Sequence, residues 1–181
     1  MFDYIPDFLP STLVKEQLDE TSFLSTTFDK KVNKEQLWFG PGYFDKQWTT
    51  IRKQWVPQEY PIWLSTLQDR VQEKYNKLCL SDVNINSCLV NKYRTGIDHI
   101  KPHRDSNYSF GKEPTILIYS VGATRQLTFK HNDSDESFSY DLENGSLFIM
   151  NGRSQEDYTH AVPPSDIGDV RYSLTFREYI R

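Results

Sequence analysis

The sequence predicts an α+β protein built on a double-stranded β-helix, the jelly-roll arrangement, with an N-terminal helical layer packed on one sheet. Three observations predict it: the length of the chain, helical periodicity in its first part and many short β-type segments in its second part. With 181 residues, 37% of them hydrophobic, the chain suits one domain with a sizeable core. We therefore expect a single domain over 1–181, with helical support in 1–86 and the jelly-roll core in 87–181.

Two helices are predicted before residue 86. Ser11 or Thr12 can cap a helix that runs to about Glu20. A second helix begins at Pro61, which suits a first turn, and continues to Tyr75. Its apolar residues recur at helical spacing, at Trp63, Leu64, Leu67, Val71 and Tyr75. The rest of this part is irregular, with mostly helical periodicity.

Six short β-rich segments follow from residue 87, each bounded by Gly, Asn, Asp or Pro. They cover residues 88–93, 115–121, 125–130, 137–140, 146–150 and 172–177. Residues 122–123 and 143–145 have the composition of turns. Many short strands with regular turns imply a sandwich or barrel, one face of which a helical layer can cover. Periodicity alone does not separate the jelly roll from other sandwiches.

Composition limits the class of protein. No apolar run approaches the length of a transmembrane helix, and the first seven residues are too acidic and too interrupted for a signal peptide. We expect a soluble intracellular monomer, in the nucleus or the cytoplasm. Cys79 and Cys88 are expected to be buried thiols rather than a disulfide. The net charge of −4 argues against a non-specific nucleic-acid binder.

A candidate metal site is carried by His103 and Asp105, with a further histidine far downstream at His160. In an extended segment, residues two apart project from the same side, so His103 and Asp105 can reach one ion while Arg104 faces away. Two imidazoles and one carboxylate can occupy one face of an octahedral Fe(II), leaving three positions for a chelating co-substrate and dioxygen. The pair alone is a weak pattern, since a solvated loop can carry it. With His160 it predicts an iron oxygenase.

The C-terminal segment supplies a candidate site for the co-substrate. Dioxygen activation at Fe(II) needs electrons, which a chelating 2-oxo acid can provide, and a buried arginine can bind its distal carboxylate through a bidentate fork. Arg171 and Arg177 are six residues apart, so on one strand both share a face with Ser173 and Thr175. The same alternation would also suit a polar outer strand face.

A basic rim is possible around the metal site despite the net charge. The residues concerned are Lys92, Arg94, Lys101 and Arg104. A solvated surface of mixed charge would have a similar composition.

Five segments carry a family resemblance: 91–105 (NKYRTGIDHIKPHRD), 120–125 (SVGATR), 145–150 (GSLFIM), 160–163 (HAVP) and 171–177 (RYSLTFR). In this order they resemble motifs of the AlkB family of Fe(II)/2-oxoglutarate dioxygenases, within which the DNA-repair demethylases of the animal type are closest. The resemblance runs from residue 88 to the end of the chain, and residues before 88 match only loosely. It implies Fe(II), 2-oxoglutarate and dioxygen as cofactor and co-substrates, and alkylated DNA or RNA as the partner.

The resemblance also implies a reaction and roles for single residues. The reaction is hydroxylation of a methyl group on a base nitrogen, as in 1-methyladenine or 3-methylcytosine, with release of formaldehyde. The implied roles are iron binding by His103, Asp105 and His160, hydrogen bonding of 2-oxoglutarate by Asn91 and Tyr93, binding of its distal carboxylate by Arg171, support of Asp105 near its chelating end by Arg177, and lining of the pocket by Thr175. Gln155 and Asp157 are candidates to support His160.

Substrate contacts are expected at two places. Enzymes that act on a flipped base stack it on aromatic side chains, and the resemblance implies an aromatic lid among Trp38, Tyr43 and Phe44. Ordinary core packing would explain each of these aromatics singly. After the metal carboxylate, close relatives carry acidic residues, where this chain has Ser106 and Asn107.

Three functions remain open from the sequence. The first is an oxidative nucleic-acid demethylase, and the second is a 2-oxoglutarate-dependent hydroxylase of a protein or small molecule, since one iron site serves many substrates. The third is a catalytically silent binding module on a jelly-roll scaffold. Retention of the metal ligands and both arginines favours an enzyme.

Overall fold

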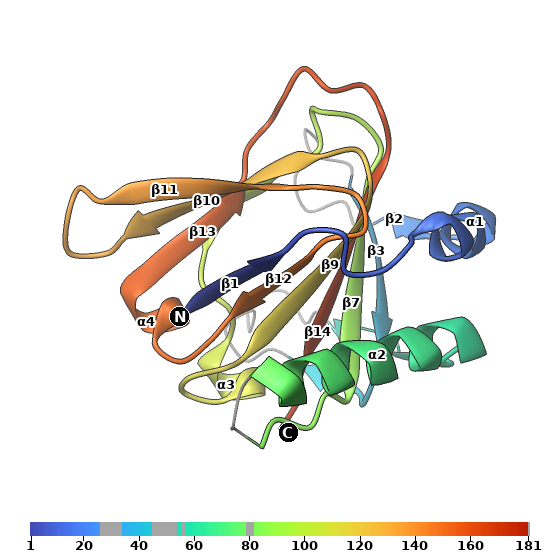
Figure 1. The fold of residues 1–181 in the computed structure, drawn as a ribbon, viewed down its shortest axis with the longest axis horizontal. Helices are drawn as coiled ribbons and strands as arrows, with labels where there is room; N and C mark the ends of the chain where they lie inside the picture. The colour runs from blue at the N-terminus through green and yellow to red at the C-terminus, as the bar shows by residue number, and fades with distance from the viewer. Residues whose placement is uncertain (26–33, 45–53, 56, 79–81, 181) are drawn as a thin grey trace.

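The computed structural model describes residues 1–25, 34–44, 54–55, 57–78 and 82–180 (Figure 1). Its first part contains β1 (Phe2–Ile5), α1 (Thr12–Glu20), β2 (Leu24–Ser25), β3 (Glu35–Phe39), β4 (Tyr43–Phe44), β5 (Gln54–Trp55), β6 (Pro57–Gln58) and α2 (Ile62–Leu78). Its second part contains β7 (Ser87–Tyr93), β8 (Ile100–His103), α3 (Asn107–Phe110), β9 (Ile116–Gly122), β10 (Arg125–His131), β11 (Ser137–Leu142), β12 (Leu147–Met150), α4 (Ser154–Asp157), β13 (Tyr158–Val162) and β14 (Arg171–Arg177).

Two sheets face each other. The large sheet has the order β1-β12-β9-β14-β7-β3-β2, with β6 added beside β3, and the small sheet has the order β11-β10-β13-β8. Strand β14 pairs antiparallel with both β7 and β9 along all seven of its residues, so it is central in the large sheet. A further short pair joins β4 to β5. This arrangement of a large and a small sheet agrees with the predicted jelly roll.

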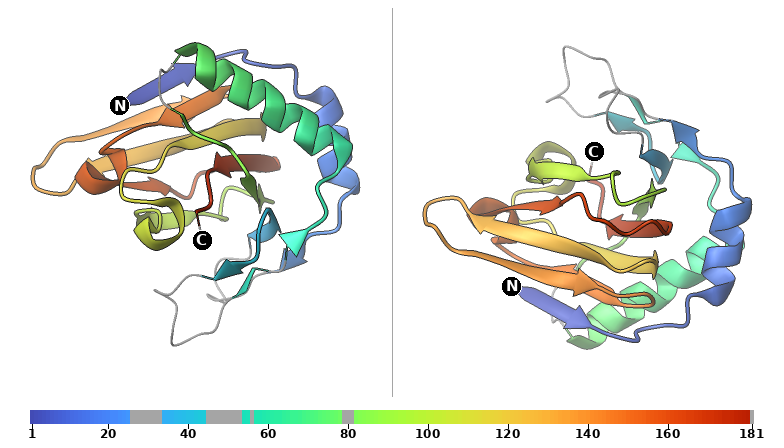
Figure 2. Two further views of the ribbon diagram at one scale, coloured as in Figure 1. Left: turned by 90° about the horizontal axis from the view of Figure 1, so that it is seen from below. Right: turned by 90° about the horizontal axis from the view of Figure 1, so that it is seen from above.

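Helices α1 and α2 cover the outer face of the large sheet (Figure 2). Leu18 of α1 and Leu64, Leu67 and Val71 of α2 share one buried cluster with alternate residues of the central strands. The opposite face of the large sheet packs on the small sheet through a second cluster that includes Ile118 and Phe129. The large sheet is therefore buried on both faces, and its inner face lines the space between the sheets.

The six predicted β segments are all strands, and the two predicted helices are present. Helix α2 is longer than predicted and ends at Leu78. Ser11 stands at the N-cap of α1, but its hydroxyl donates to Asn144 Oδ1 at 2.7 Å instead of capping the helix. The mostly helical character expected for residues 1–86 is wrong in one respect, because β1 and β3 from this part pair with β12 and β7 in the large sheet.

Two strands that the sequence did not predict complete the small sheet. Strand β8 is four residues long, partly exposed and contains Pro102, and β13 is five residues long, so neither has the apolar run that marks a strand. Strand β8 pairs with β13, and β13 also pairs with β10. These pairings set the place of both strands in the small sheet.

Among the described residues, no helix is long and apolar enough to cross a membrane. Cys88 is a buried free thiol, as predicted, and burial raises the pKa of its thiol above the usual range. Cys79 lies outside the described residues.

Candidate metal and co-substrate site

The two histidines of the candidate metal site lie opposite each other in the small sheet. His103 of β8 pairs with His160 of β13, and their ring centroids are 4.3 Å apart. The next pair along is Val162 with Ile100, so the register shifts by one residue in β8. A bulge of this kind re-aims a side chain, and proline is tolerated there. The shift at 101–102 lets both Ile100 and His103 face the interior of the barrel, although they are three residues apart.

Asp105 lies two residues after the end of β8 and completes the cluster. One ligand atom from each of His103, Asp105 and His160 lies within 4.8 Å of the others, and within the described part of the chain this is the group of His, Cys, Asp and Glu side chains able to share an ion. Oδ1 of Asp105 is 3.6 Å from Nε2 of His103 and 4.0 Å from Nε2 of His160. The three predicted ligands are thus brought together, and the donor set of two imidazoles and one carboxylate fits Fe(II).

Asp105 is held through its carboxylate and through its backbone. Nε of Arg177 donates to Oδ2 of Asp105 at 2.5 Å, which leaves Oδ1 facing the imidazoles. The backbone N–H of Asp105 donates to Oε1 of Gln155 at 2.8 Å. Burial alone would raise the pKa of Asp105, but the charge of Arg177 and the neighbouring histidines hold this pKa well below its usual range. Asp105 is therefore a carboxylate, as a metal ligand must be.

His160 is buried and His103 is partly exposed. Burial, together with neighbouring His103, lowers the pKa of His160 to about 3, so its imidazole is neutral and able to bind a metal. The side chain of His103 is 37% exposed, and its Nδ1 lies 3.0 Å from the carbonyl oxygen of Lys101. The candidate metal site is consequently open to solvent on the His103 side and closed on the His160 side.

The residues expected to bind the co-substrate lie on the inner faces of β7 and β14. Every residue of β14 is buried, and Arg171, Ser173, Thr175 and Arg177 alternate with the three residues that pack under the helices. Asn91 and Tyr93 lie in register with Ser173 and Arg171 on the neighbouring strand. The alternative of a polar outer face for this strand is therefore excluded.

Arg171 has the clearest features of an anion-binding residue. The residue is 1% exposed, and Nη2 donates to Oγ of Ser120 at 3.1 Å. Tyr93 is a further polar neighbour, but the buried Nε and Nη1 have no partner in hydrogen-bond geometry. Burial lowers the pKa of this guanidinium, although arginine stays charged in proteins. A buried cation with unpaired donors is costly unless a ligand compensates it. A carboxylate, which accepts two parallel bonds from a guanidinium, fits this position.

Trp38 lies in the core. Its side chain is 1% exposed and packs with Phe110 and Tyr179, and its indole N–H donates to the carbonyl oxygen of Pro41 at 2.7 Å. In this arrangement no ring face is open to a base, so the structure gives Trp38 a packing role in place of the expected substrate contact. The reason is that β3 belongs to the large sheet, where alternate residues point into the barrel.

The other expected substrate contacts differ in exposure. Tyr43 and Phe44 form β4, but their side chains lie outside the described residues. Ser106 is buried at the start of α3, where its carbonyl oxygen accepts from the N–H of Phe110 at 3.0 Å. Asn107 is exposed next to the candidate metal site. The contacts of these residues with a substrate remain predictions. Of Ser106 and Asn107, Asn107 is the one whose side chain a substrate can reach directly.

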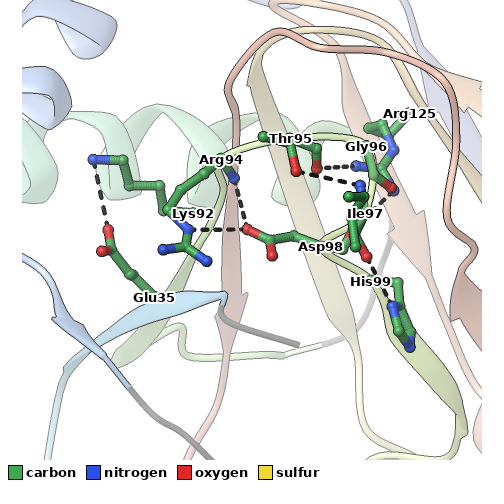
Figure 3. Close-up of polar contacts among 9 residues, drawn as sticks. All are labelled: Glu35, Lys92, Arg94, Thr95, Gly96, Ile97, Asp98, His99 and Arg125. Carbon is green, nitrogen blue, oxygen red and sulfur yellow. Dashed lines mark hydrogen bonds and ion pairs between the residues drawn. The ribbon is translucent and has the colours of Figure 1, made fainter. Parts of the chain in front are cut away.

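The expected basic rim is smaller than the sequence indicated. Lys92 lies 3.6 Å from Glu35, and Arg94 lies 3.2 Å from Asp98 (Figure 3). Each of these two cations is paired with a carboxylate. Lys101 and Arg104 are exposed in the segment that also carries His103, so this segment contributes to any positive rim.

Two supporting residues were missed or misplaced by sequence reasoning. Gln155 was expected to support His160, yet it accepts from the backbone of Asp105 and donates to Sδ of Met150 at 3.6 Å. Ser120 was not singled out, although it pairs with Ser173 across β9 and β14 and contacts Arg171. Its place two residues before Gly122 in a β segment was the available signal.

Comparison with known proteins assigns the chain to a family. The model of the 2OG-Fe(II) oxygenase superfamily matches residues 4–177. The chain belongs to this superfamily. Membership implies Fe(II), 2-oxoglutarate and dioxygen, which confirms the cofactors predicted from the sequence.

Curated relatives of this 2OG-Fe(II) oxygenase confirm the resemblance to AlkB proteins. DNA oxidative demethylase ALKBH2 of Mus musculus is 32% identical over 141 residues, 73% of this chain and 54% of the relative. Alpha-ketoglutarate-dependent dioxygenase alkB homolog 3 of Homo sapiens is 33% identical over 131 residues, 67% of this chain and 43% of the relative. The chain spans about half the length of these relatives.

Solved structures support the fold of the oxygenase. OsALKBH1 matches with a TM-score of 0.66 at 18% identity, covering 98% of this chain and 97% of that one. A prolyl-4-hydroxylase of Pseudomonas putida matches with a TM-score of 0.62 at 14% identity, covering 99% of this chain and 92% of that one. At these identities the matches establish the shared jelly-roll fold.

Proposed function

We propose that this 2OG-Fe(II) oxygenase removes alkyl groups from base nitrogens in DNA or RNA, acting on 1-methyladenine or 3-methylcytosine and releasing formaldehyde. The observation that carries the proposal is the meeting, inside one barrel, of a His-Asp-His cluster with a buried arginine whose Nε and Nη1 are unpaired. The names of the relatives, DNA oxidative demethylase among them, direct the choice of substrate.

The chain's own residues fit the parts of this reaction. Bound iron and 2-oxoglutarate would supply the oxidising power for hydroxylation of the methyl group. His103, Asp105 and His160 would hold the iron, and Arg177 keeps Oδ2 of Asp105 occupied so that Oδ1 stays available. Arg171 would fix the distal carboxylate of the co-substrate, which places its other end toward the metal.

We propose that the base approaches from the His103 side. His103 is the exposed member of the metal cluster, and the exposed cations Lys101 and Arg104 flank it in the chain. Phosphate groups are attracted by such cations, and the attraction is screened by salt. Asn107 is close enough in sequence to Asp105 to offer its amide to an exocyclic amine. The proposed partner is alkylated DNA or RNA bound by a monomer, in the nucleus or the cytoplasm.

The test is a demethylation assay. The protein is incubated with Fe(II), 2-oxoglutarate, ascorbate and oligonucleotides that carry 1-methyladenine or 3-methylcytosine, as single and double strands of DNA and RNA. We expect formaldehyde and the unmodified base from at least one of these substrates. Intact methylated base, under conditions where bound iron is measured, would refute the nucleic-acid assignment without touching the iron site.

A second function is a hydroxylase of a protein or small molecule. Two observations favour it: the net charge of −4, and the neutral residues Ser106 and Asn107 directly after the metal carboxylate. Neither residue offers a charge that attracts a cationic base. Uncoupled decarboxylation of 2-oxoglutarate, unaffected by any methylated oligonucleotide but stimulated by a peptide or small molecule, would support this alternative.

A further inference from the structure

Two of the connections between the sheets meet at one end of the barrel. Residues 94–99 lead from β7 to β8, and residues 163–170 lead from β13 to β14. Figure 1 shows both loops together above the sheets, and the N–H of Ser165 donates to the carbonyl oxygen of Gly96 at 2.9 Å. A Cβ on Gly96 would lie 1.9 Å from the carbonyl oxygen of Ser165, so only glycine permits this approach.

Each of these loops joins a co-substrate strand to a metal strand. Strand β7 carries Asn91 and Tyr93 and β8 carries His103, while β13 carries His160 and β14 carries Arg171. The contact between the loops therefore fixes how the co-substrate residues of the large sheet sit relative to the metal ligands of the small sheet.

Arg125, at the start of β10, ties the two loops together. Its Nη2 donates to the carbonyl oxygens of Pro163 at 2.6 Å, Asp98 at 2.9 Å and Gly96 at 3.3 Å, and its Nη1 donates to that of Thr95 at 3.3 Å. Figure 3 shows the guanidinium against the 95–98 backbone. One side chain thus contacts both crossings at once.

Burial of the charge of Arg125 lowers the stability of the fold. The residue is 2% exposed, its hydrogen bonds go to neutral carbonyl groups, and its buried Nε has no hydrogen-bond partner. The nearby carboxylate of Asp98 is already engaged by the backbone N–H of Arg94 at 2.9 Å and by Nε of Arg94. A buried charge that falls short of full pairing is weak evidence for a role in stability, and such charges cluster at functional sites.

Arg125 reaches the co-substrate pocket through Tyr93. The carbon at the centre of its guanidinium lies 5.5 Å from the centroid of the Tyr93 ring, and that of Arg171 lies 5.2 Å from the same centroid. Tyr93 is 1% exposed and is held between two cations. Moving Arg125 would therefore move Tyr93, and with it the wall against which Arg171 rests.

We propose that Arg125 is a positioning residue for 2-oxoglutarate, which fixes Tyr93 and Arg171 for the distal carboxylate by clamping the two crossing loops. This inference rests on the proposed role of Arg171 and is independent of the nucleic-acid substrate. The hydrogen bonds of Arg125 go to the two loops and its guanidinium lies over Tyr93, so we expect its loss to affect the distal carboxylate more than the metal.

The test compares two chelating ligands on the Mn(II)-loaded protein by calorimetry. 2-Oxoglutarate has a distal carboxylate, whereas oxalate chelates the metal without one. In Arg125→Met we expect the affinity for 2-oxoglutarate to fall roughly tenfold or more, the scale of loss seen when residues that support a metal site are replaced. We expect the affinity for oxalate to change less than about twofold. Arg125→Lys keeps the charge but not the fork, and we expect a smaller loss of the same kind.

Lys130→Met is the matched control, because it removes one cation from the exposed side of the same strand. We expect it to leave both affinities unchanged. Equal losses for 2-oxoglutarate and oxalate, or no loss for either, would overturn the proposal. If Arg125→Met does not fold by circular dichroism, Arg125→Lys decides by the same criterion. If Arg171→Met lowers the affinity for 2-oxoglutarate no more than the affinity for oxalate, the proposed role of Arg171 fails before that of Arg125 is tested.

Discussion

The two faces of β14 are both buried, but they differ in chemistry. On the outer face Tyr172, Leu174 and Phe176 pack with α1 and α2 in an apolar cluster. On the inner face the strand presents two arginines with Ser173 and Thr175 between them. Burial of apolar side chains accounts for the outer face as a source of stability. The inner face needs a different explanation, because a buried cation with unpaired donors, such as Arg171, lowers stability.

The difference between the two faces of β14 indicates where function resides in this barrel. Replacing a buried ion cluster by well-packed apolar residues often leaves the stability of a protein unchanged or raises it. The polar inner face of β14 and β7 is thus best understood as a ligand surface, continuous with the metal cluster through the contact of Arg177 with Asp105. Substitutions on the two faces should therefore separate binding from folding.

The largest effect is expected from the metal cluster. His103→Ala should abolish iron binding and turnover, because Asp105 and His160 alone cannot fill the three positions on one face of the ion. The side chain of His103 is partly exposed, so the melting temperature without metal should change little. Iron content and formaldehyde release measure the outcome, and retained turnover would refute the metal site.

A large but selective effect is expected at Arg171. Arg171→Met should weaken 2-oxoglutarate binding by about 2–5 kcal/mol, the cost of removing one partner of a buried charge pair. Metal affinity should stay the same, since Arg171 contacts Ser120 and Tyr93 and none of the three metal ligands in the bonds described above. Titration of the Mn(II) form with 2-oxoglutarate measures this, and unchanged affinity would remove Arg171 from its role.

The outer face should show the reverse pattern. Leu174→Ala deletes a fully buried side chain and should lower the free energy of unfolding by about 2–5 kcal/mol. At a temperature where the variant is folded, its affinity for 2-oxoglutarate should match the wild type. Urea denaturation and the same titration check both halves. A loss of affinity as large as that of Arg171→Met would mean that the faces are not separable.

The smallest effect is expected at Ser120. Ser120→Ala removes the acceptor of Nη2 of Arg171 and should weaken 2-oxoglutarate binding by about 1.5 kcal/mol, the scale of one hydrogen bond to a charged group. Stability should change less than in Leu174→Ala, because no large side chain is lost. A loss equal to that of Arg171→Met would indicate that Ser120 itself binds the co-substrate.

Features of the chain that depend on local patterns could be predicted from sequence, and features that depend on long-range pairing could not. The alternation in β14 and the spacing of His103 and Asp105 are local, so residue periodicity indicated both. The bulge that turns His103 inward is created by pairing with β13, and no local pattern reports it. Likewise, β3 is in the large sheet because of its pairing with β7, which moved Trp38 from an expected lid into the core. Long-range pairing, rather than propensity, decided these positions.

The most direct test of the central claim is a crystal structure of the protein with Mn(II) and 2-oxoglutarate. We expect the ion on His103, Asp105 and His160, and the distal carboxylate on the Nε and Nη1 atoms of Arg171 that have no partner in the present structure. A metal bound elsewhere, or a co-substrate whose distal carboxylate lies on another cation, would contradict the account.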